Sequence, residues 1–312
     1  MKARRAPTIF RNKNATKPGH LLHLDLHFLE TETEEGDRYY TIVVDAYSRM
    51  FFIFFHKDEK DTTVVAISDH LLIKLRQTPP KVITPQEIFS DNAKKYVRKE
   101  VAAWCTKHHI THTLSSPYYS YQNGLAESPG FYLMDTRRAL MKEAEMPDQY
   151  IHYGLRHAVD LHNSMYSSSL PADDSIPYTR HFKEPVTFKH LLPFGSYVAC
   201  FIPKAPREPG DYQNIAQEGV YLGRSSTQGY ASRIVALFPN GKTVVTPEYQ
   251  ADPTLFPLRT QAAQRFRPFA HPLPITDFGK DSEMDSEPPI KFQVGDSTYE
   301  PKDIDSEDDG PP

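Results

Sequence analysis

The chain has 312 residues, enough for about two domains, and its apolar fraction of 39% is ordinary for a globular protein. No apolar run approaches the ~20 residues of a membrane-spanning helix, and no signal peptide precedes the body, which argues against a membrane partner. The cysteines, Cys105 and Cys200, lie far apart in different contexts, which argues against a disulfide framework and against a cysteine-based zinc site.

The net charge of −4 conceals an uneven distribution. Residues 271–312 hold twelve acids and three lysines, a net charge of −9, which leaves +5 on the rest of the chain. The first twenty residues hold six Lys or Arg and no acid, and such a basic arm is suited to meeting a polyanion. A solvated charge run without a partner is an equally good reading.

The first half of the chain alternates between two kinds of predicted element. After a basic arm at 1–20, runs rich in β-branched and aromatic residues predict three strands with short links, at 21–28, 38–46 and 49–56. Helical spacing and turn signals then predict a helix at 61–77, a strand at 81–89, a helix at 94–107, a strand at 110–114 and helices at 124–145 and 148–166. A meander followed by alternating elements predicts an α/β core over 21–168, with a mixed five-stranded sheet flanked by helices.

The composition changes beyond this core. Residues 169–189 are predicted to be a linker, and 190–257 a small β-rich domain whose short strands are separated by Gly, Pro and Asn-Gly turns. Asn240-Gly241 is a strong hairpin signal. Residues 258–312, dominated by Pro, Ser and acid, are predicted to be a disordered tail.

Three carboxylates stand in three different local settings. Asp25 lies within the apolar run LLHLDLHF, Asp91 ends the run VITPQEIFSD, and Glu127 follows a turn and opens a helix. A strand seldom buries an unpaired acid, because desolvating the charge is costly; the alternative for Asp25 is pairing with a nearby base. Three acids delivered by separate elements to one place would make a site for hard divalent cations, which prefer oxygen ligands.

Other polar residues of these strands have competing interpretations. His23 and His27 share a face with Asp25, because strand side chains alternate with a period of two. The pattern His-x-Asp-x-His is conceivable as a metal site, but we favour polar lining of a cleft or partial exposure for both histidines. Asp45 ends a hydrophobic strand and is expected to be structural rather than a fourth ligand.

A series of short motifs carries these residues. They are HLDL with Asp25, VVDAYSR at 43–49, FSDNAKKY at 89–96, GLAE at 124–127, HLLPFG at 190–195, and GVYLG followed by GYASRIV. In order and spacing, residues 1–257 resemble the integrase region of a Ty1/copia-type retrotransposon polyprotein. The HLLPFG and GVYLG stretches extend the resemblance beyond the core, which disfavours an RNase H-like nuclease that hydrolyses DNA without joining it.

The resemblance implies an RNase H-like fold and a DDE triad of Asp25, Asp91 and Glu127. In the family, these acids hold two Mg²⁺ or Mn²⁺ ions, which assist in-line phosphoryl displacement during the joining of element DNA ends to target DNA. It further implies DNA as a partner, a homo-oligomer, and a nuclear or cytoplasmic location. No zinc is expected, because the chain starts just after the point where the family's His-His-Cys-Cys module would end.

The chain departs from the family pattern beside two of the acids. Ala93, Lys94 and Lys95 stand where the family favours two glycines and a glutamate, and residues 128–131 replace basic residues and asparagine. Pro129 costs ~3 kcal/mol or more inside a helix and is tolerated in the first turn, so it is placed to tilt Glu127. These departures keep open an alternative, a catalytically inactive nucleic-acid-binding remnant of a retrotransposon polyprotein.

Polar and basic residues near the triad are candidates for contacts with DNA phosphates and bases. For the residues of the Asn-Gly turn, turn chemistry is an alternative explanation, and for the cations a solvated surface. The candidate contacts are Asn92, Lys94, Lys95, Gln122, Asn123, Arg137 and Arg138.

Overall fold

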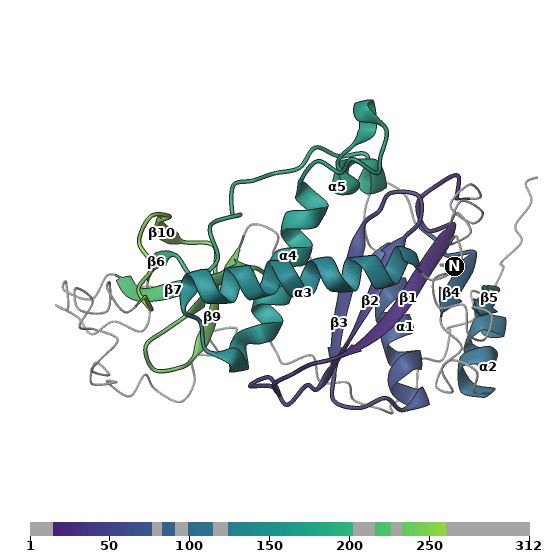
Figure 1. The fold of residues 1–312 in the computed structure, drawn as a ribbon, viewed down its shortest axis with the longest axis horizontal. Coiled ribbons are helices and arrows are strands. Elements are labelled where there is room, and N and C mark those ends of the chain that lie inside the picture. The colour runs from purple at the N-terminus through teal and green to yellow at the C-terminus, as the bar shows by residue number, and fades with distance from the viewer. Residues whose placement is uncertain are drawn as a thin grey trace, which may run out of the picture.

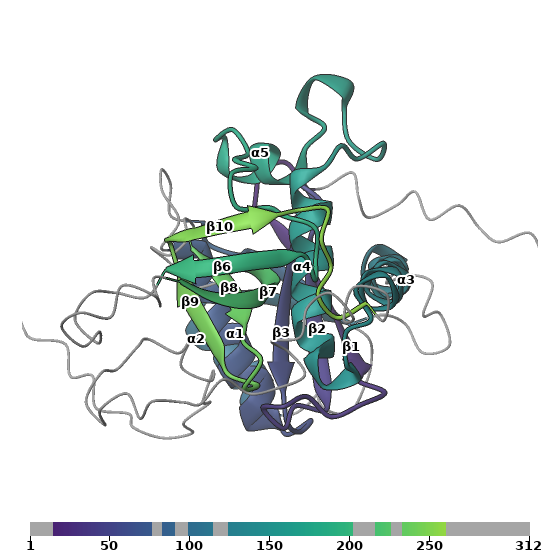
Figure 2. The same cartoon turned by 90° about the vertical axis from the view of Figure 1, so that its left-hand side faces the viewer.

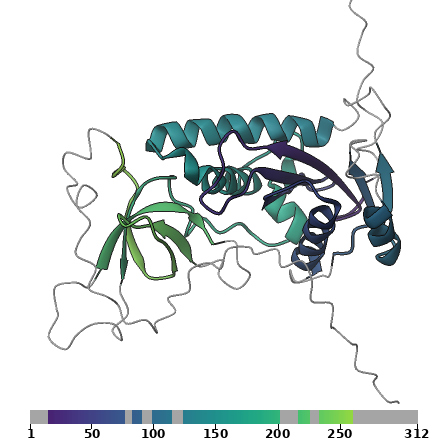
Figure 3. The same cartoon turned by 90° about the horizontal axis from the view of Figure 1, so that it is seen from below.

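The computed structural model describes residues 15–76, 83–90, 99–114, 124–201, 216–225 and 233–259. Most of the basic arm and of the acidic tail predicted from the sequence lie outside these ranges. Two sheets stand at opposite ends of the molecule, and the long helix α3 (Gly124–Ala144) runs alongside both of them (Figures 1 and 3).

The first sheet confirms the predicted α/β architecture. Its strands are β1 (Leu21–Phe28), β2 (Tyr39–Asp45), β3 (Phe51–His56), β4 (Glu87–Ser90) and β5 (Thr111–Leu114), in the order β3-β2-β1-β4-β5. β1, β2 and β3 pair antiparallel, whereas β4 lies parallel to β1 and β5 parallel to β4. A meander extended by two parallel strands is the arrangement of an RNase H-like sheet.

Helices cover both faces of this sheet. Successive strand residues point to opposite faces, and both faces carry apolar side chains. α1 (Asp61–Arg76) and α2 (Lys99–Lys107) pack on the face that carries Leu22 and Leu24. α3 and α4 (Ile151–Ser164) pack on the face that carries Tyr40 and Ile42. Fully burying one such side chain stabilises the fold by ~1.5–3 kcal/mol, so the two cores fix which face of β1 each residue occupies.

The second sheet is antiparallel and forms a separate layer in front of α4 (Figure 2). Its strands are β6 (Tyr197–Phe201), β7 (Ala216–Arg224), β8 (Ile234–Leu237), β9 (Thr243–Thr246) and β10 (Tyr249–Asp252), in the order β10-β6-β7-β8-β9. The predicted Asn240-Gly241 hairpin is confirmed between β8 and β9. Gly241 has a φ of 80°, a conformation that glycine adopts at little cost.

The second sheet packs on α3 and α4, the same helices that cover one face of the first sheet. Met141 and Ala144 at the end of α3 pack with Val220 and Leu237 of the second sheet. Gly195 lies beside Ala144 with a φ of 83°, and a Cβ atom at Gly195 would overlap the Ala144 side chain. Close approach and backbone conformation therefore both require glycine here.

Several boundaries differ from those expected. The strand predicted at 81–89 begins only at Glu87, because Pro85 has no N–H to donate to a ladder. Within the predicted β-rich domain, the run KTVVTPEY at 242–249 is divided between β9 and β10 on either side of Pro247. The segment 169–189, predicted as linker, contains the short helix α5 (Pro177–Phe182), and 3-10 turns occur at Asp148–Tyr150 and Ala172–Asp174. None of the described helices combines the length and the apolar character needed to cross a bilayer.

His157 of α4 makes the contact between α4 and the second sheet sensitive to acid. Its imidazole lies 5.7 Å from the Phe194 ring and 5.8 Å from the Tyr221 ring, and burial lowers its pKa to about 4. The unfolded chain takes up a proton near pH 6.5, whereas the folded protein resists protonation until about pH 4. Stability is therefore expected to fall as the pH falls through this window, by roughly 3 kcal/mol at its lower end.

Urea unfolding of the wild type and of His157→Gln at pH 7 and pH 4.5 checks this expectation. The variant should lose less stability between the two pH values than the wild type. Other groups titrate in both proteins, including Asp37, whose pKa burial raises to about 6, and so they cancel in the comparison. Equal losses in the two proteins would contradict a neutral buried imidazole.

Candidate active site

The pairing of β1 with β4 positions the first two acids of the predicted triad. Asp25 is the fifth residue of β1, and it lies on the face covered by α3, because Leu24 faces the α1 and α2 core. The last parallel pair of the register joins Leu24 to Ser90. These are the residues that precede Asp25 and Asp91 in the chain, although Asp91 itself lies outside the described residues.

α3 brings the third predicted position to the same face. The helix begins at Gly124 and continues through Pro129, so its predicted extent is confirmed despite the proline. Pro129 is the sixth residue of the helix and therefore removes one helical hydrogen bond, because only the first four N–H groups lack an acceptor within the helix. Glu127 belongs to the first turn of α3, while its side chain lies outside the described residues. Position 127 precedes Gly130 by three residues, so the two share one face of the helix.

Gly130 is the point at which α3 meets β1. A Cβ atom there would overlap the imidazole of His27, with Nε2 only 2.6 Å away, so the glycine permits the close approach of helix and strand. The His27 ring stacks on Tyr40, with ring centroids 5.0 Å apart. The imidazole is therefore held between a neighbouring strand and the helix that carries Glu127.

Asp25 has a close polar neighbour in His27. The Asp25 Oδ2 and His27 Nε2 atoms are 3.2 Å apart, and the side chains are 14% and 25% exposed respectively. His23, the other histidine of the pattern, is buried with its ring 5.1 Å from that of Phe89. Of the two histidines on the face of Asp25, His27 is thus the one beside the carboxylate.

The acid on β1 has the chemistry that a hard divalent ion requires. The Asp25 side chain is partly accessible and lies just beyond the last register pair of β1 with β4, on the face that α3 covers. Within the described part of the chain, no group of three or more His, Cys, Asp and Glu residues is placed to hold a metal ion. That part contains the Asp25 side chain but neither of the other two acid side chains of the predicted triad.

The predicted nucleic-acid contacts divide into two sets. The Arg137 side chain is 6% exposed, with Nη2 3.5 Å from Glu30, while Arg138 is 56% exposed and pairs with the other oxygen of Glu30 at 3.1 Å. The Arg138 hydrogen bond, with the nearby Arg137 charge, lowers the pKa of Glu30. Arg138 is accordingly the accessible member of the pair. The remaining predicted contacts lie outside the described residues: Asn92, Lys94, Lys95, Gln122 and Asn123.

Asp45 is structural, as predicted. Its fully buried carboxylate accepts hydrogen bonds from the backbone N–H groups of Gly19, Tyr47 and Ser48, at 2.5, 2.8 and 2.9 Å. His181 of α5 lies 3.5 Å from the same carboxylate and 2.9 Å from the Ser48 hydroxyl. The sequence carried no signal for this histidine, because its partners are more than 130 positions away.

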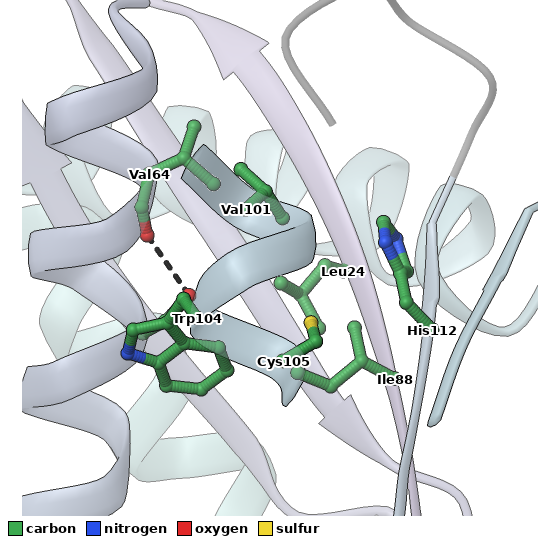
Figure 4. A pocket seen from close by; sticks show the side chains of 8 residues that line it. Leu24, Val64, Ile88, Val101, Trp104, Cys105 and His112 are labelled. Atoms are coloured by element: carbon green, nitrogen blue, oxygen red, sulfur yellow. Dashed lines mark hydrogen bonds between the residues drawn. The ribbon is translucent and has the colours of Figure 1, made fainter. Parts of the chain in front are cut away.

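A small pocket lies on the opposite face of the sheet (Figure 4). Leu24 and Ile88 form its floor, and Val101, Trp104 and Cys105 of α2 form its wall. His112 stands at its edge, with Nε2 2.9 Å from the Ser90 hydroxyl, and burial lowers the pKa of this imidazole. The predominantly apolar lining makes this pocket part of the core rather than of the candidate active site.

Comparisons with known proteins agree with this geometry. Residues 15–120 match the family model of the integrase core domain. The retrovirus-related Pol polyprotein from transposon TNT 1-94 of Nicotiana tabacum is 26% identical over 187 residues, which cover 60% of this chain and 14% of that polyprotein. The corresponding polyprotein from transposon RE2 of Arabidopsis thaliana is 25% identical over 263 residues, covering 83% of this chain and 17% of the polyprotein. The chain thus spans less than a fifth of these curated relatives.

Solved structures of viral integrases are also similar. The HTLV-2 integrase catalytic core domain, in complex with magnesium, matches with a TM-score of 0.41 and 17% identity, covering 54% of this chain and 99% of that one. The simian T-cell lymphotropic virus intasome in complex with a PP2A regulatory subunit matches with a TM-score of 0.44 and 18% identity, covering 77% of this chain and 78% of that one. The family model thus identifies an integrase core domain at residues 15–120, and the chain is similar beyond that domain to the Pol polyproteins of plant retrotransposons.

Proposed function

We propose that this chain is a DDE recombinase that joins the DNA ends of a retroelement to target DNA. Asp25, Asp91 and Glu127 hold Mg²⁺ or Mn²⁺ in this proposal. The observation that carries it is the parallel register of β1 and β4, which aligns the residues preceding Asp25 and Asp91, beneath the helix to which Glu127 belongs.

The chemistry of the site follows from these donors. Divalent ions held by carboxylates supply activation of the attacking oxygen and stabilisation of the leaving oxygen in an in-line displacement. The chain itself would contribute oxygen ligands on anchored elements, because strand β1 is paired with β2 and helix α3 packs through Leu133 in the core shared with α4. The Arg138 side chain is half exposed on α3 and pairs with Glu30. In this proposal it leaves Glu30 and binds a DNA phosphate instead.

DNA is the partner that this proposal requires, and a homo-oligomer is the assembly that the family resemblance implies. The excess of positive charge outside the acidic tail favours an encounter with a polyanion. Because phosphate contacts release counterions, DNA binding is expected to weaken as the salt concentration rises.

Calorimetric titration with Mg²⁺ and Mn²⁺ tests the shared site. Asp91→Asn and Glu127→Gln should each weaken metal binding by at least ~10-fold. Losing a metal ligand is expected to cost more affinity than losing a residue that only hydrogen-bonds a ligand. Asp148→Asn, a change at an exposed acid before α4, is the control and should bind as the wild type does. Wild-type affinity in both test variants would refute convergence of the three acids. An absence of metal binding by the folded protein in the presence of DNA would favour the inactive nucleic-acid-binding remnant.

A further inference from the structure

We propose that His27 is a nitrogen ligand to the divalent ion bound at Asp25, an inference that rests on the proposed function. The His27 Nε2 and Asp25 Oδ2 atoms are 3.2 Å apart. Neighbouring ligands of an octahedral ion with bonds of ~2.1 Å are separated by about 3.0 Å. The two atoms therefore have the spacing of adjacent ligands, and a shift of a few tenths of an ångström brings them to one ion.

The His27 ring is fixed in place before any ion arrives. It stacks on Tyr40 with an interplanar angle of 19°, and the absence of a side chain at Gly130 creates the space that it occupies beneath α3. A ligand whose rotamer is already restricted loses little conformational entropy on binding. Glu127 lies one helical turn from Gly130, so the imidazole and the third acid belong to neighbouring positions on the two elements.

The polar environment of Nε2 points to the same role. This nitrogen is buried, and within the described residues its contact with Asp25 Oδ2 lacks the geometry of a hydrogen bond. Leaving a buried polar atom unsatisfied is costly, and a shared ion with Asp25 removes that cost. His23 is buried as well, with its ring packed against that of Phe89 at 5.1 Å.

A nitrogen ligand alters which metals the site prefers. Carboxylate and water ligands suit Mg²⁺, whereas imidazole binds the transition metals more strongly. The site of this chain is therefore expected to bind Mn²⁺ more tightly than Mg²⁺. Replacing His27 should remove most of that preference while leaving the oxygen ligands in place.

Pulsed electron paramagnetic resonance of the Mn²⁺-loaded protein tests the inference directly. The wild type should show a directly bonded ¹⁴N nucleus, and His27→Gln should lose this signal. Calorimetry should show Mn²⁺ affinity falling by ~10-fold or more in the same variant, and Mg²⁺ affinity changing less. His109→Asn, at an exposed histidine after α2, is the matched control and should retain both the signal and the affinity.

The outcomes separate the two proposals. Mn²⁺ binding that is lost in Asp25→Asn, without a nitrogen signal in the wild type, would overturn the role of His27 and leave the metal site intact. A nitrogen signal that persists in His27→Gln would also overturn it. Failure of the folded wild type to bind Mn²⁺ would overturn both proposals. A circular dichroism spectrum for each variant establishes that it is folded.

Discussion

Replacing Asp25 with asparagine is expected to lower metal-dependent strand transfer at least ~1000-fold. Replacing a residue that hydrogen-bonds a metal ligand commonly lowers metal affinity or activity by about 10–100-fold. Asp25 would bind the ion itself, so its loss should have a larger effect. The fold should survive the change, because the Asp25 side chain is partly exposed and asparagine keeps nearly the same shape and one acceptor oxygen. Loss of activity without loss of stability is the signature of a catalytic ligand rather than of a core residue.

Joining of a labelled oligonucleotide, which carries the element's terminal sequence, to target DNA measures this effect. Mg²⁺ and Mn²⁺ should both be supplied, and urea unfolding should be measured on the same preparations. Asp148→Asn serves again as a control acid outside the proposed site, with activity expected to match the wild type. Undiminished strand transfer by Asp25→Asn would remove Asp25 from the catalytic machinery.

The first sheet was predictable where local sequence and burial agree. β2 has aromatic and β-branched residues throughout, and Tyr40, Ile42 and Val44 are buried on the face that α3 and α4 cover. α3 was predicted almost to the residue, because Gly124 opens it and the apolar period continues beyond Pro129. The order of the motifs then placed Asp25 and Glu127 on elements that meet.

The parts that escaped prediction depend on distant contacts. β10 exists because it pairs with β6, about fifty positions earlier, and no local pattern reports that pairing. α5 is too short for a periodic signal and is held from outside, since Arg180 donates to the Tyr47 carbonyl at 2.9 Å and lies over the Tyr47 ring. A segment that reads as a linker can thus be fixed to the core by two contacts of a single arginine side chain.

The same limit applied to the candidate site. The alternating pattern put His23, Asp25 and His27 on one face of β1, but it could not distinguish the two histidines. The distinction arises where α3 crosses the strand, because Gly130 leaves room for the His27 imidazole beside Asp25. Sequence order therefore predicted the candidate donors, whereas the distance between Asp25 and His27 depends on the packing of a helix that lies about a hundred residues further along the chain.

Asp45→Ala is expected to destabilise the protein by ~3–5 kcal/mol, the range for removing one partner of a buried ionic network. The carboxylate accepts three backbone N–H groups, those of Gly19, Tyr47 and Ser48, and alanine would leave them buried and unsatisfied. Arg49 would lose its nearby negative charge as well: burial lowers the pKa of its guanidinium, and Asp45 opposes that shift. The whole β2–β3 turn therefore depends on this acid.

Urea unfolding of Asp45→Ala and Asp45→Asn distinguishes the structural role from a metal-binding one. Asparagine keeps an acceptor oxygen in nearly the same shape, so it should cost less than alanine, about 1–3 kcal/mol. In the absence of urea, Asp45→Asn should still bind Mn²⁺ with wild-type affinity. The Asp45 carboxylate is fully buried and accepts a hydrogen bond from the backbone of its own loop, so it does not face the proposed metal site. Unchanged stability in both variants would contradict this account. A selective loss of Mn²⁺ binding in Asp45→Asn would instead make Asp45 a ligand, and the turn would have to open toward β1 to allow it.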